Sequence, residues 1–132
     1  MPPAQLPSIL VVDDNHDNVD IIRHYLEVRG YPISVAHNGD EALAQFESIR
    51  PNIILLDVMM PGRDGWEVCR VMRQHPELGK LVRIIMVTAL DEMDDKRTAL
   101  QTGADDYVEK PFDLARLAAT VERNAALLPA AR

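Results

Sequence analysis

The segment Asn52-Ile53-Ile54-Leu55-Leu56-Asp57 gives the clearest indication of the fold of this chain. Its four consecutive apolar residues predict a short strand that is buried on both faces. Strands of this kind belong to parallel sheets that are covered by helices on each side. The strand ends on Asp57, so a carboxylate stands where the buried strand reaches the surface.

Similar strands recur on either side of this stretch and alternate with amphipathic segments. We expect strands over residues 8–13, 33–37, 52–57, 81–88 and 106–109. The helical spacing of apolar residues predicts helices that carry Val19 to Leu26 and end before Gly30, Glu41 to Ile49, Trp66 to Met72, Asp91 to Thr102, and Leu114 to Leu128 after an Asp113 cap. These five βα units predict a flavodoxin-like (βα)5 sandwich of three layers, with a parallel five-stranded sheet of order 2-1-3-4-5. Right-handed crossovers then place a functional site at the carboxyl ends of the strands, where the order reverses between the first and third strands.

Length and composition limit the possible functions. The 132 residues fit one domain, which we expect over residues 8–128, between a disordered tail at 1–7 and a C-terminal tail at 129–132. The net charge of −7 argues against a nucleic-acid partner, because an acidic surface repels the phosphates of a duplex. No apolar run approaches the roughly 20 residues of a membrane helix and no signal peptide is visible, so we expect a cytoplasmic protein. The start at Met1 and the end soon after the last helix favour a stand-alone protein. The chain has one cysteine, Cys69, which we expect to pack in a helix and which cannot form a disulfide within the chain.

Polar side chains follow four of the predicted strands, at the point where each strand ends. They are Asp13 and Asp14 after the first strand, Asp57 on the third, Thr88 on the fourth and Lys110 after the fifth. Three neighbouring carboxylates stay ionised only beside strong positive charge, and a cation with oxygen ligands and several waters suits them, which favours Mg²⁺. The Lys110 ammonium can pair with a phosphoryl oxygen, and the Thr88 hydroxyl can donate a hydrogen bond to another. The set predicts a site where a carboxylate attacks phosphorus and forms an aspartyl phosphate.

These residues resemble those of the receiver domains of bacterial response regulators. The resemblance includes Pro61-Gly62 after the central aspartate and the segment Gly103-Ala104-Asp105-Asp106-Tyr107-Val108-Glu109-Lys110-Pro111-Phe112. It implies that Asp57 is the phosphoacceptor, that Asp14 and Asp57 bind Mg²⁺ directly, and that Asp13 acts mostly through water. The backbone carbonyl of Met59 would complete the protein ligands.

The same resemblance implies how the site would work. Lys110 would contact the phosphoryl group, Thr88 would shift towards it, and Tyr107 would rotate from exposed to buried. The donor would be a phosphohistidine on a sensor histidine kinase or on a histidine phosphotransfer protein. The phosphorylated chain would bind a downstream protein through the face made by the fourth helix, fifth strand and fifth helix. Such a chain is a signalling switch and not an enzyme, since it catalyses only its own phosphorylation and dephosphorylation.

In receivers fused to DNA-binding domains, that face often forms a symmetric dimer held by acid–base pairs. Asp105, Asp106 and Arg123 resemble part of this pattern, whereas Arg116 stands where an acid would be expected and Thr120 where a base would be expected. Arg116 would also face another positive charge at Lys96. We therefore expect an unphosphorylated monomer that contacts neither nucleic acid nor membrane.

Two local expectations concern the surroundings of the site. The Lys110-Pro111 bond is expected to be cis, because an X-Pro bond adopts cis for about 0.5–1 kcal/mol and a tight turn is its usual setting. Met59 and Leu90 are expected to flank the path of water to the phosphoryl group. Both are apolar and cannot orient a water molecule, so we predict slow dephosphorylation. His16 lies near the acidic pair and is expected to be a surface residue.

Other functions fit this sequence less well. A calcium loop that begins at Asp13 would need Gly at its sixth position and Glu at its twelfth, where this chain has Asn18 and His24. A flavodoxin would share the fold, but Asp13 and Asp14 would repel the phosphate of FMN. A phosphatase with an aspartate nucleophile would carry Asp-x-Asp after the first strand, whereas here the acids are adjacent. A degenerate receiver used only for binding is disfavoured by the complete acidic set.

Overall fold

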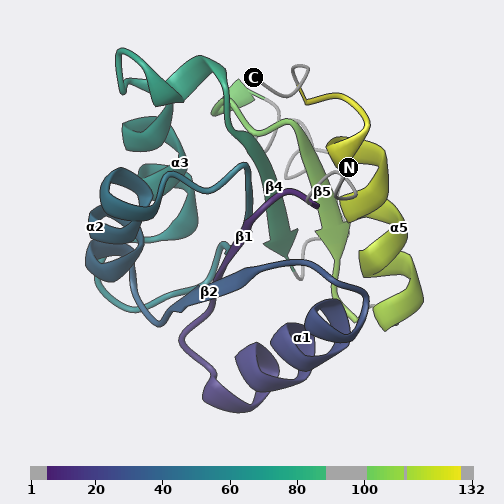
Figure 1. The fold of residues 1–132 in the computed structure, drawn as a ribbon. Coiled ribbons are helices and arrows are strands. Elements are labelled where there is room, and N and C mark those ends of the chain that lie inside the picture. Colours follow the sequence, from purple (N-terminus) through teal and green to yellow (C-terminus); the bar gives the residue numbers. More distant parts are fainter. Residues whose placement is uncertain (1–5, 89–100, 112, 129–132) are drawn as a thin grey trace.

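The computed structural model describes residues 6–88, 101–111 and 113–128, which form a parallel sheet between two layers of helices (Figure 1). The sheet has five strands in the order β2-β1-β3-β4-β5, which confirms the predicted flavodoxin-like topology. The strands are β1 (Ile9–Val12), β2 (Ile33–Ala36), β3 (Ile53–Asp57), β4 (Arg83–Thr88) and β5 (Asp106–Glu109).

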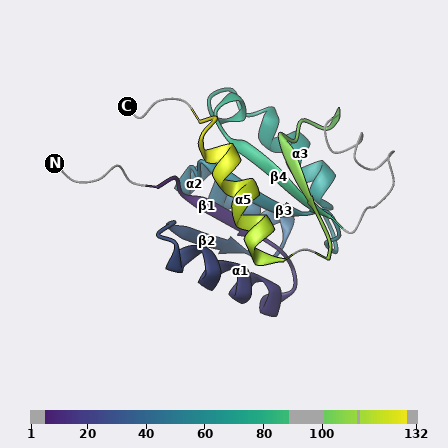
Figure 2. The ribbon, with the colours of Figure 1, turned by 90° about the vertical axis from the view of Figure 1, so that its right-hand side faces the viewer.

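Helices cover both faces of this sheet. They are α1 (His16–Val28), α2 (Gly39–Ile49), α3 (Gly65–Arg73), the short 3-10 helix η1 (Leu78–Lys80) and α5 (Leu114–Ala125). The helices α2 and α3 pack on one face and α1 and α5 on the other, and Figure 2 shows α5 in front of the sheet. Most of the helix predicted over residues 91–102 lies outside the described residues, as do Leu90 and the tails at 1–5 and 129–132.

Successive residues of the central strand fill two separate cores. In β3, Ile54 and Leu56 face α2 and α3 and belong to what we call the α2/α3 core. Ile53 and Leu55 face the opposite side and belong to the α1/α5 core. All four side chains are buried, because helices cover both faces of the strand, as its run of apolar residues predicts.

The single cysteine is part of the α2/α3 core. Cys69 is buried, as predicted, and its thiol donates to the backbone oxygen of Thr102 across 3.7 Å. Burial raises the pKa of the Cys69 thiol to about 11. The thiol therefore stays protonated at neutral pH and serves as a packing group.

Side-chain caps set the beginnings of the helices. The side chains of Asn15, Asn38, Asp64 and Asp113 each accept a hydrogen bond from the backbone N–H three residues further on. Such caps satisfy backbone donors that have no partner inside the helix. The predicted Asp113 cap is confirmed, and α2 begins at Gly39, two residues before the predicted Glu41, because Asn38 caps it.

The start of β4 and the end of the last helix also differ from the predicted boundaries. Strand β4 begins at Arg83 and not at Leu81, because the preceding residues form η1. That turn depends on His75, whose Nδ1 accepts hydrogen bonds from the N–H groups of Glu77 and Leu78. The last helix ends at Ala125, and Leu128 lies beyond it in turns closed by hydrogen bonds over three residues.

Candidate functional site

The carboxyl ends of four strands meet at one edge of the sheet. The register places Leu56 of β3 beside Val12 of β1, and Asp57 beside Val87 of β4. Strand β1 pairs with β2 on one side and with β3 on the other, so the order of the strands reverses at this point. Open parallel sheets bind their ligands at such a reversal, outside the carboxyl ends of the strands.

Three carboxylates converge at this edge. Asp13, Asp14 and Asp57 each offer a carboxylate oxygen, and these oxygens all lie within 4.8 Å of one another. Asp57 is 3% exposed and Asp13 is 4% exposed, whereas Asp14 is open to solvent. One oxygen of Asp13 accepts a hydrogen bond from the N–H of Asn15 at 2.9 Å, which fixes that carboxylate beside the end of β1.

These residues fit Mg²⁺ as a ligand set. All three donors are hard oxygens, and two ligands of an octahedral Mg²⁺ ion lie about 3–4 Å apart, given metal–oxygen distances of about 2.1 Å. A span of 4.8 Å therefore allows some of the carboxylates to bind directly and another to act through water. The predicted trio is brought together, as the topology requires.

An ammonium group offsets part of the negative charge of the three carboxylates. Lys110 Nζ donates a hydrogen bond to Asp57 Oδ1 at 3.2 Å. The Lys110 backbone N–H donates to the carbonyl oxygen of Thr88 at 2.6 Å, so the lysine follows directly on the β4–β5 ladder. The Lys110-Pro111 bond is cis, as predicted. Thr88 is buried at the last position of β4.

The surroundings of Asp57 oppose its ionisation. Burial raises the pKa of this carboxyl most, and the negative charge of Asp13 raises it further. The ammonium of Lys110 and the N–H of Met59 lower it, and the balance raises the pKa of Asp57 to about 6. The carboxylate is thus mostly ionised at neutral pH but gains from added positive charge, which is a property of functional carboxylates.

A glycine behind the site was not identified from the sequence. A Cβ on Gly65 would lie 2.3 Å from the backbone oxygen of Asp57 and 2.8 Å from the Cα of Val58. The Gly65 N–H also donates to the Val58 carbonyl at 3.0 Å. Only glycine allows α3 to begin this close to the end of β3, and a glycine immediately after the Asp64 cap was the available signal.

Met59 and Tyr107 occupy positions that the resemblance singles out. The Met59 N–H donates to Asp57 Oδ1 at 3.4 Å, and its side chain is 70% exposed beside the site. Tyr107 is half-buried on β5, opposite Met86 of β4, where it packs against the α2/α3 core.

Two histidines meet next to the acidic residues. His16 is exposed, as predicted, but its ring stacks on that of His37 with centroids 3.9 Å apart and an angle of 7° between the planes. The stack joins the start of α1 to the loop after β2. A ring nitrogen binds a metal in the plane of its ring, so two parallel rings do not converge on one ion. The pair is a packing contact that the sequence spacing of the histidines did not reveal.

The acids and the base of the expected dimer pattern are paired within one chain. Arg123 donates to Asp106 at 2.5 Å, and Asn124 donates to the same carboxylate oxygen at 3.0 Å. Asp105 forms ion pairs with Arg73 and Arg83. These internal partners were not predicted.

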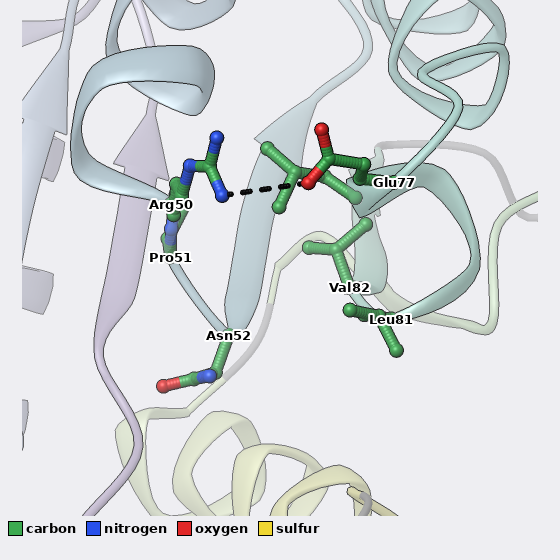
Figure 3. Close-up of a pocket in the computed structure, with 7 residues that line it drawn as sticks. Arg50, Pro51, Asn52, Glu77, Leu81 and Val82 are labelled. Carbon is green, nitrogen blue, oxygen red and sulfur yellow. Dashed lines mark ion pairs between the residues drawn. The ribbon is translucent and has the colours of Figure 1, made fainter.

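A hollow lies at the opposite edge of the sheet from the carboxylates. Its volume is about 220 Å³, and it is lined by Arg50, Pro51, Asn52, Glu77, Leu78, Leu81 and Val82 (Figure 3). Arg50 and Glu77 form an ion pair across it at 3.8 Å. Both side chains are mostly exposed, so the pair adds little to the free energy of unfolding.

None of the helices in the described parts of the chain is long and apolar enough to cross a membrane.

Comparisons with known proteins agree with this arrangement. The family model for the response regulator receiver domain matches residues 9–122. The chemotaxis response regulator CheY4 of Vibrio cholerae is similar, with 30% identity over 91% of this chain and 99% of that chain, and a TM-score of 0.86. The signal receiver domain of a signal transduction histidine kinase from Syntrophus aciditrophicus has 32% identity over 96% of this chain and 95% of that chain, with a TM-score of 0.86. The receiver domain of the Francisella response regulator 1452 has 30% identity over 92% of this chain and 98% of that chain, with a TM-score of 0.85.

Proposed function

Because the chain belongs to the response-regulator receiver family, we propose that it transmits a signal by accepting a phosphoryl group on Asp57 in a Mg²⁺-dependent reaction. One observation carries the proposal. Three carboxylate oxygens lie within 4.8 Å of one another, and Lys110 Nζ lies 3.2 Å from the central carboxylate, where the order of the parallel strands reverses. The donor is a sensor histidine kinase or a histidine phosphotransfer protein. We place the chain in the cytoplasm, because one cysteine cannot form a disulfide within the chain and the cytoplasm is a reducing compartment.

The proposed chemistry is a transfer between two side chains. An oxygen of the Asp57 carboxylate attacks the phosphorus of a phosphohistidine, so a P–O bond forms while the P–N bond breaks. The departing imidazole keeps the electron pair of that bond and takes up a proton from solvent. When bound, Mg²⁺ supplies positive charge to the oxygens in transfer. Lys110 and Thr88 hold two phosphoryl oxygens. The protein therefore contributes to the reaction by positioning the groups and neutralising their charge. It modifies only itself and is therefore not an enzyme in the usual sense.

Labelling from acetyl phosphate tests the proposal. In the presence of Mg²⁺ the chain should take up one phosphoryl group, seen as a single shift of intact mass that EDTA prevents. A phosphatase with an aspartate nucleophile would instead turn over p-nitrophenyl phosphate many times. Repeated turnover without a stable labelled species would contradict the proposal, and so would labelling that does not need a divalent cation.

Removal of Asp14 should weaken Mg²⁺ binding more than removal of Asp13. The Asp14 carboxylate is open to solvent, whereas that of Asp13 is buried and already accepts the Asn15 N–H. Loss of a group that acts through water typically costs about tenfold in metal affinity, so we expect about tenfold for Asp13→Ala and more for Asp14→Ala. Titration of the fluorescence of Trp66, the single tryptophan, measures both constants, and Asp17→Ala on exposed α1 is the control. Equal losses would show that the two roles are not separate.

Met59→Asn should shorten the lifetime of the phosphorylated state. The Met59 side chain is 70% exposed beside Asp57 and cannot orient a water molecule. An amide can, and one added hydrogen bond of about 1 kcal/mol corresponds to about a fivefold faster hydrolysis. Decay of the labelled mass after removal of acetyl phosphate gives the rate. Met59→Leu should decay like the parent, and an unchanged rate for Met59→Asn would remove the argument.

We expect a monomer before phosphorylation and a different protein as the main reader of the phosphorylated face. Asp106 and Arg123 are paired with each other inside the chain, so a symmetric dimer would first have to break that contact. Sedimentation with and without beryllofluoride, which mimics the phosphoryl group, measures the oligomeric state. A tight dimer that forms only with beryllofluoride and is lost on Arg123→Glu would contradict this expectation.

A further inference from the structure

Asp105 connects the two helical layers at the beginning of β5. Its Oδ2 accepts hydrogen bonds from the N–H of Ile84 at 2.8 Å and from Arg73 Nη2. Its Oδ1 lies 3.5 Å from Arg83 Nη1. Arg73 comes from α3 and Arg83 begins β4, so one carboxylate holds two cations and a strand at the same point. We call Asp105, Arg73 and Arg83 the β5 clamp.

The arginines of the clamp are themselves fixed. Arg73 Nη1 donates to the carbonyl oxygens of Gly79 and Val82 at 2.8 Å each, and its Nε donates to Gly103 at 2.5 Å. Arg83 donates through Nε and Nη2 to Asn124 Oδ1 at 3.1 and 3.0 Å. Through these two arginines Asp105 is connected to Gly79, Val82 and Asn124, which lie outside the segment that leads into β5.

Strand β5 is attached by side chains at its beginning, through Asp105 in the clamp and through Asp106, which is paired with Arg123 and Asn124 of α5. The strand has four residues and, in the described parts of the chain, pairs only with β4. A shift along β4 by one residue moves a strand by about 3.3 Å, and a shift by two keeps its faces unchanged. Lys110 follows β5 directly, and its Nζ lies 3.2 Å from Asp57. Any such shift would separate the ammonium from the site.

We propose that Asp105 is a positioning residue for Lys110, because it fixes the register of β5 and thereby sets the ammonium beside Asp57. The proposal rests on the proposed phosphorylation of Asp57. Asp105 lies at the end of β5 opposite to Lys110 and touches no reacting atom, so its part in the reaction is indirect.

The first test compares two substitutions of Asp105. Asp105→Ala removes the carboxylate contacts and keeps the backbone hydrogen bond from residue 105 to the Ile84 carbonyl. We expect the rate of labelling from acetyl phosphate at saturating Mg²⁺ to fall about tenfold, since small misplacements of catalytic groups have effects of this size or larger. Asp105→Asn keeps an oxygen for the Ile84 N–H and should recover most of the rate. Leu26→Ala, buried in the α1/α5 core, is the control: it lowers the free energy of unfolding but should label like the parent at a temperature where all variants are folded. An unchanged rate for Asp105→Ala would overturn the proposal.

The second test asks whether Asp105 acts through Lys110. In a Lys110→Ala background the ammonium is absent, so Asp105→Ala should cause no further loss of labelling rate. Independent losses that multiply would overturn the proposal, because they would mean that Asp105 acts by another route.

Hydrogen exchange separates the two proposals. The Lys110 N–H donates to the Thr88 carbonyl, and in Asp105→Ala this N–H should exchange with solvent at least about tenfold faster. In Leu26→Ala its exchange rate should change only by as much as the lower free energy of global unfolding requires. If the parent chain takes up no phosphoryl group, the proposed function fails. If labelling succeeds but this exchange is the same with and without Asp105, the clamp does not set the register.

Discussion

Asp57→Asn should take up no phosphoryl group from acetyl phosphate, a loss of at least about 100-fold against the parent chain. An amide is a poor nucleophile, and the substitution keeps the size of the side chain in a buried site. The remaining carboxylates are poorly placed to replace it. Asp13 is buried and accepts the Asn15 N–H, and Asp14 does not pair with Lys110 in the structure. Intact mass after incubation with Mg²⁺ measures the uptake.

Two further measurements sharpen this prediction. Hydroxylamine should release the label from the parent chain, because an acyl phosphate is labile to it and a phosphoserine is not. Asp20→Asn, on the exposed side of α1, should label like the parent. Labelling of Asp57→Asn at the parent rate would place the acceptor elsewhere and refute the assignment.

Asp57→Asn should also stabilise the protein at neutral pH in the absence of divalent cations. Burial and the charge of Asp13 raise the pKa of Asp57 from 3.8 to about 6, which corresponds to an ionisation cost of about 3 kcal/mol. The native state therefore binds a proton that the unfolded chain has released between these two pH values. The contribution of this carboxyl to the free energy of unfolding is fully present below pH 3.8 and is lost as the pH rises to about 6.

Urea unfolding in EDTA measures this effect. At pH 7.5 the free energy of unfolding of Asp57→Asn should exceed that of the parent by up to about 3 kcal/mol, and most of the difference should disappear at pH 4.5. Asp20→Asn corrects for the general effect of losing one acid. Added Mg²⁺ should reduce the gap at pH 7.5, because it binds the native parent more tightly than the variant. A gap that is equal at both pH values would show that Asp57 is not the titrating group.

The parallel sheet could be predicted because local patterns and global topology agree in this chain. The apolar run of β3 requires cover on both faces, and five alternating units leave few arrangements that satisfy it. The Asp113 cap gave the start of α5, and the helix predicted from Glu41 begins two residues earlier, at Gly39. The 3-10 helix η1 was missed because its hydrogen bonds to His75 follow no periodic pattern.

The carboxylates and Lys110 could be brought together from sequence alone, because parallel strands carry their ends to one edge. Residues whose partners depend on long-range packing could not. Arg73 and Asp105 are 32 residues apart and nothing in either segment marks the other. The demand for glycine at position 65 comes from the backbone oxygen of Asp57, and the His16–His37 stack from the meeting of two loops. Each of these is a property of the assembled fold.

Because Cys69 is buried, the folded chain has no native thiol that reacts readily with thiol reagents. The protonated sulfur of Cys69, with a pKa raised to about 11, gives alkylating reagents almost nothing to attack while the domain stays closed. A spin label or fluorophore can thus be attached to a cysteine introduced at an exposed helical position without first replacing Cys69. The slow reaction of Cys69 itself then measures how often the α2/α3 core opens, because the buried sulfur reacts only when an opening exposes it.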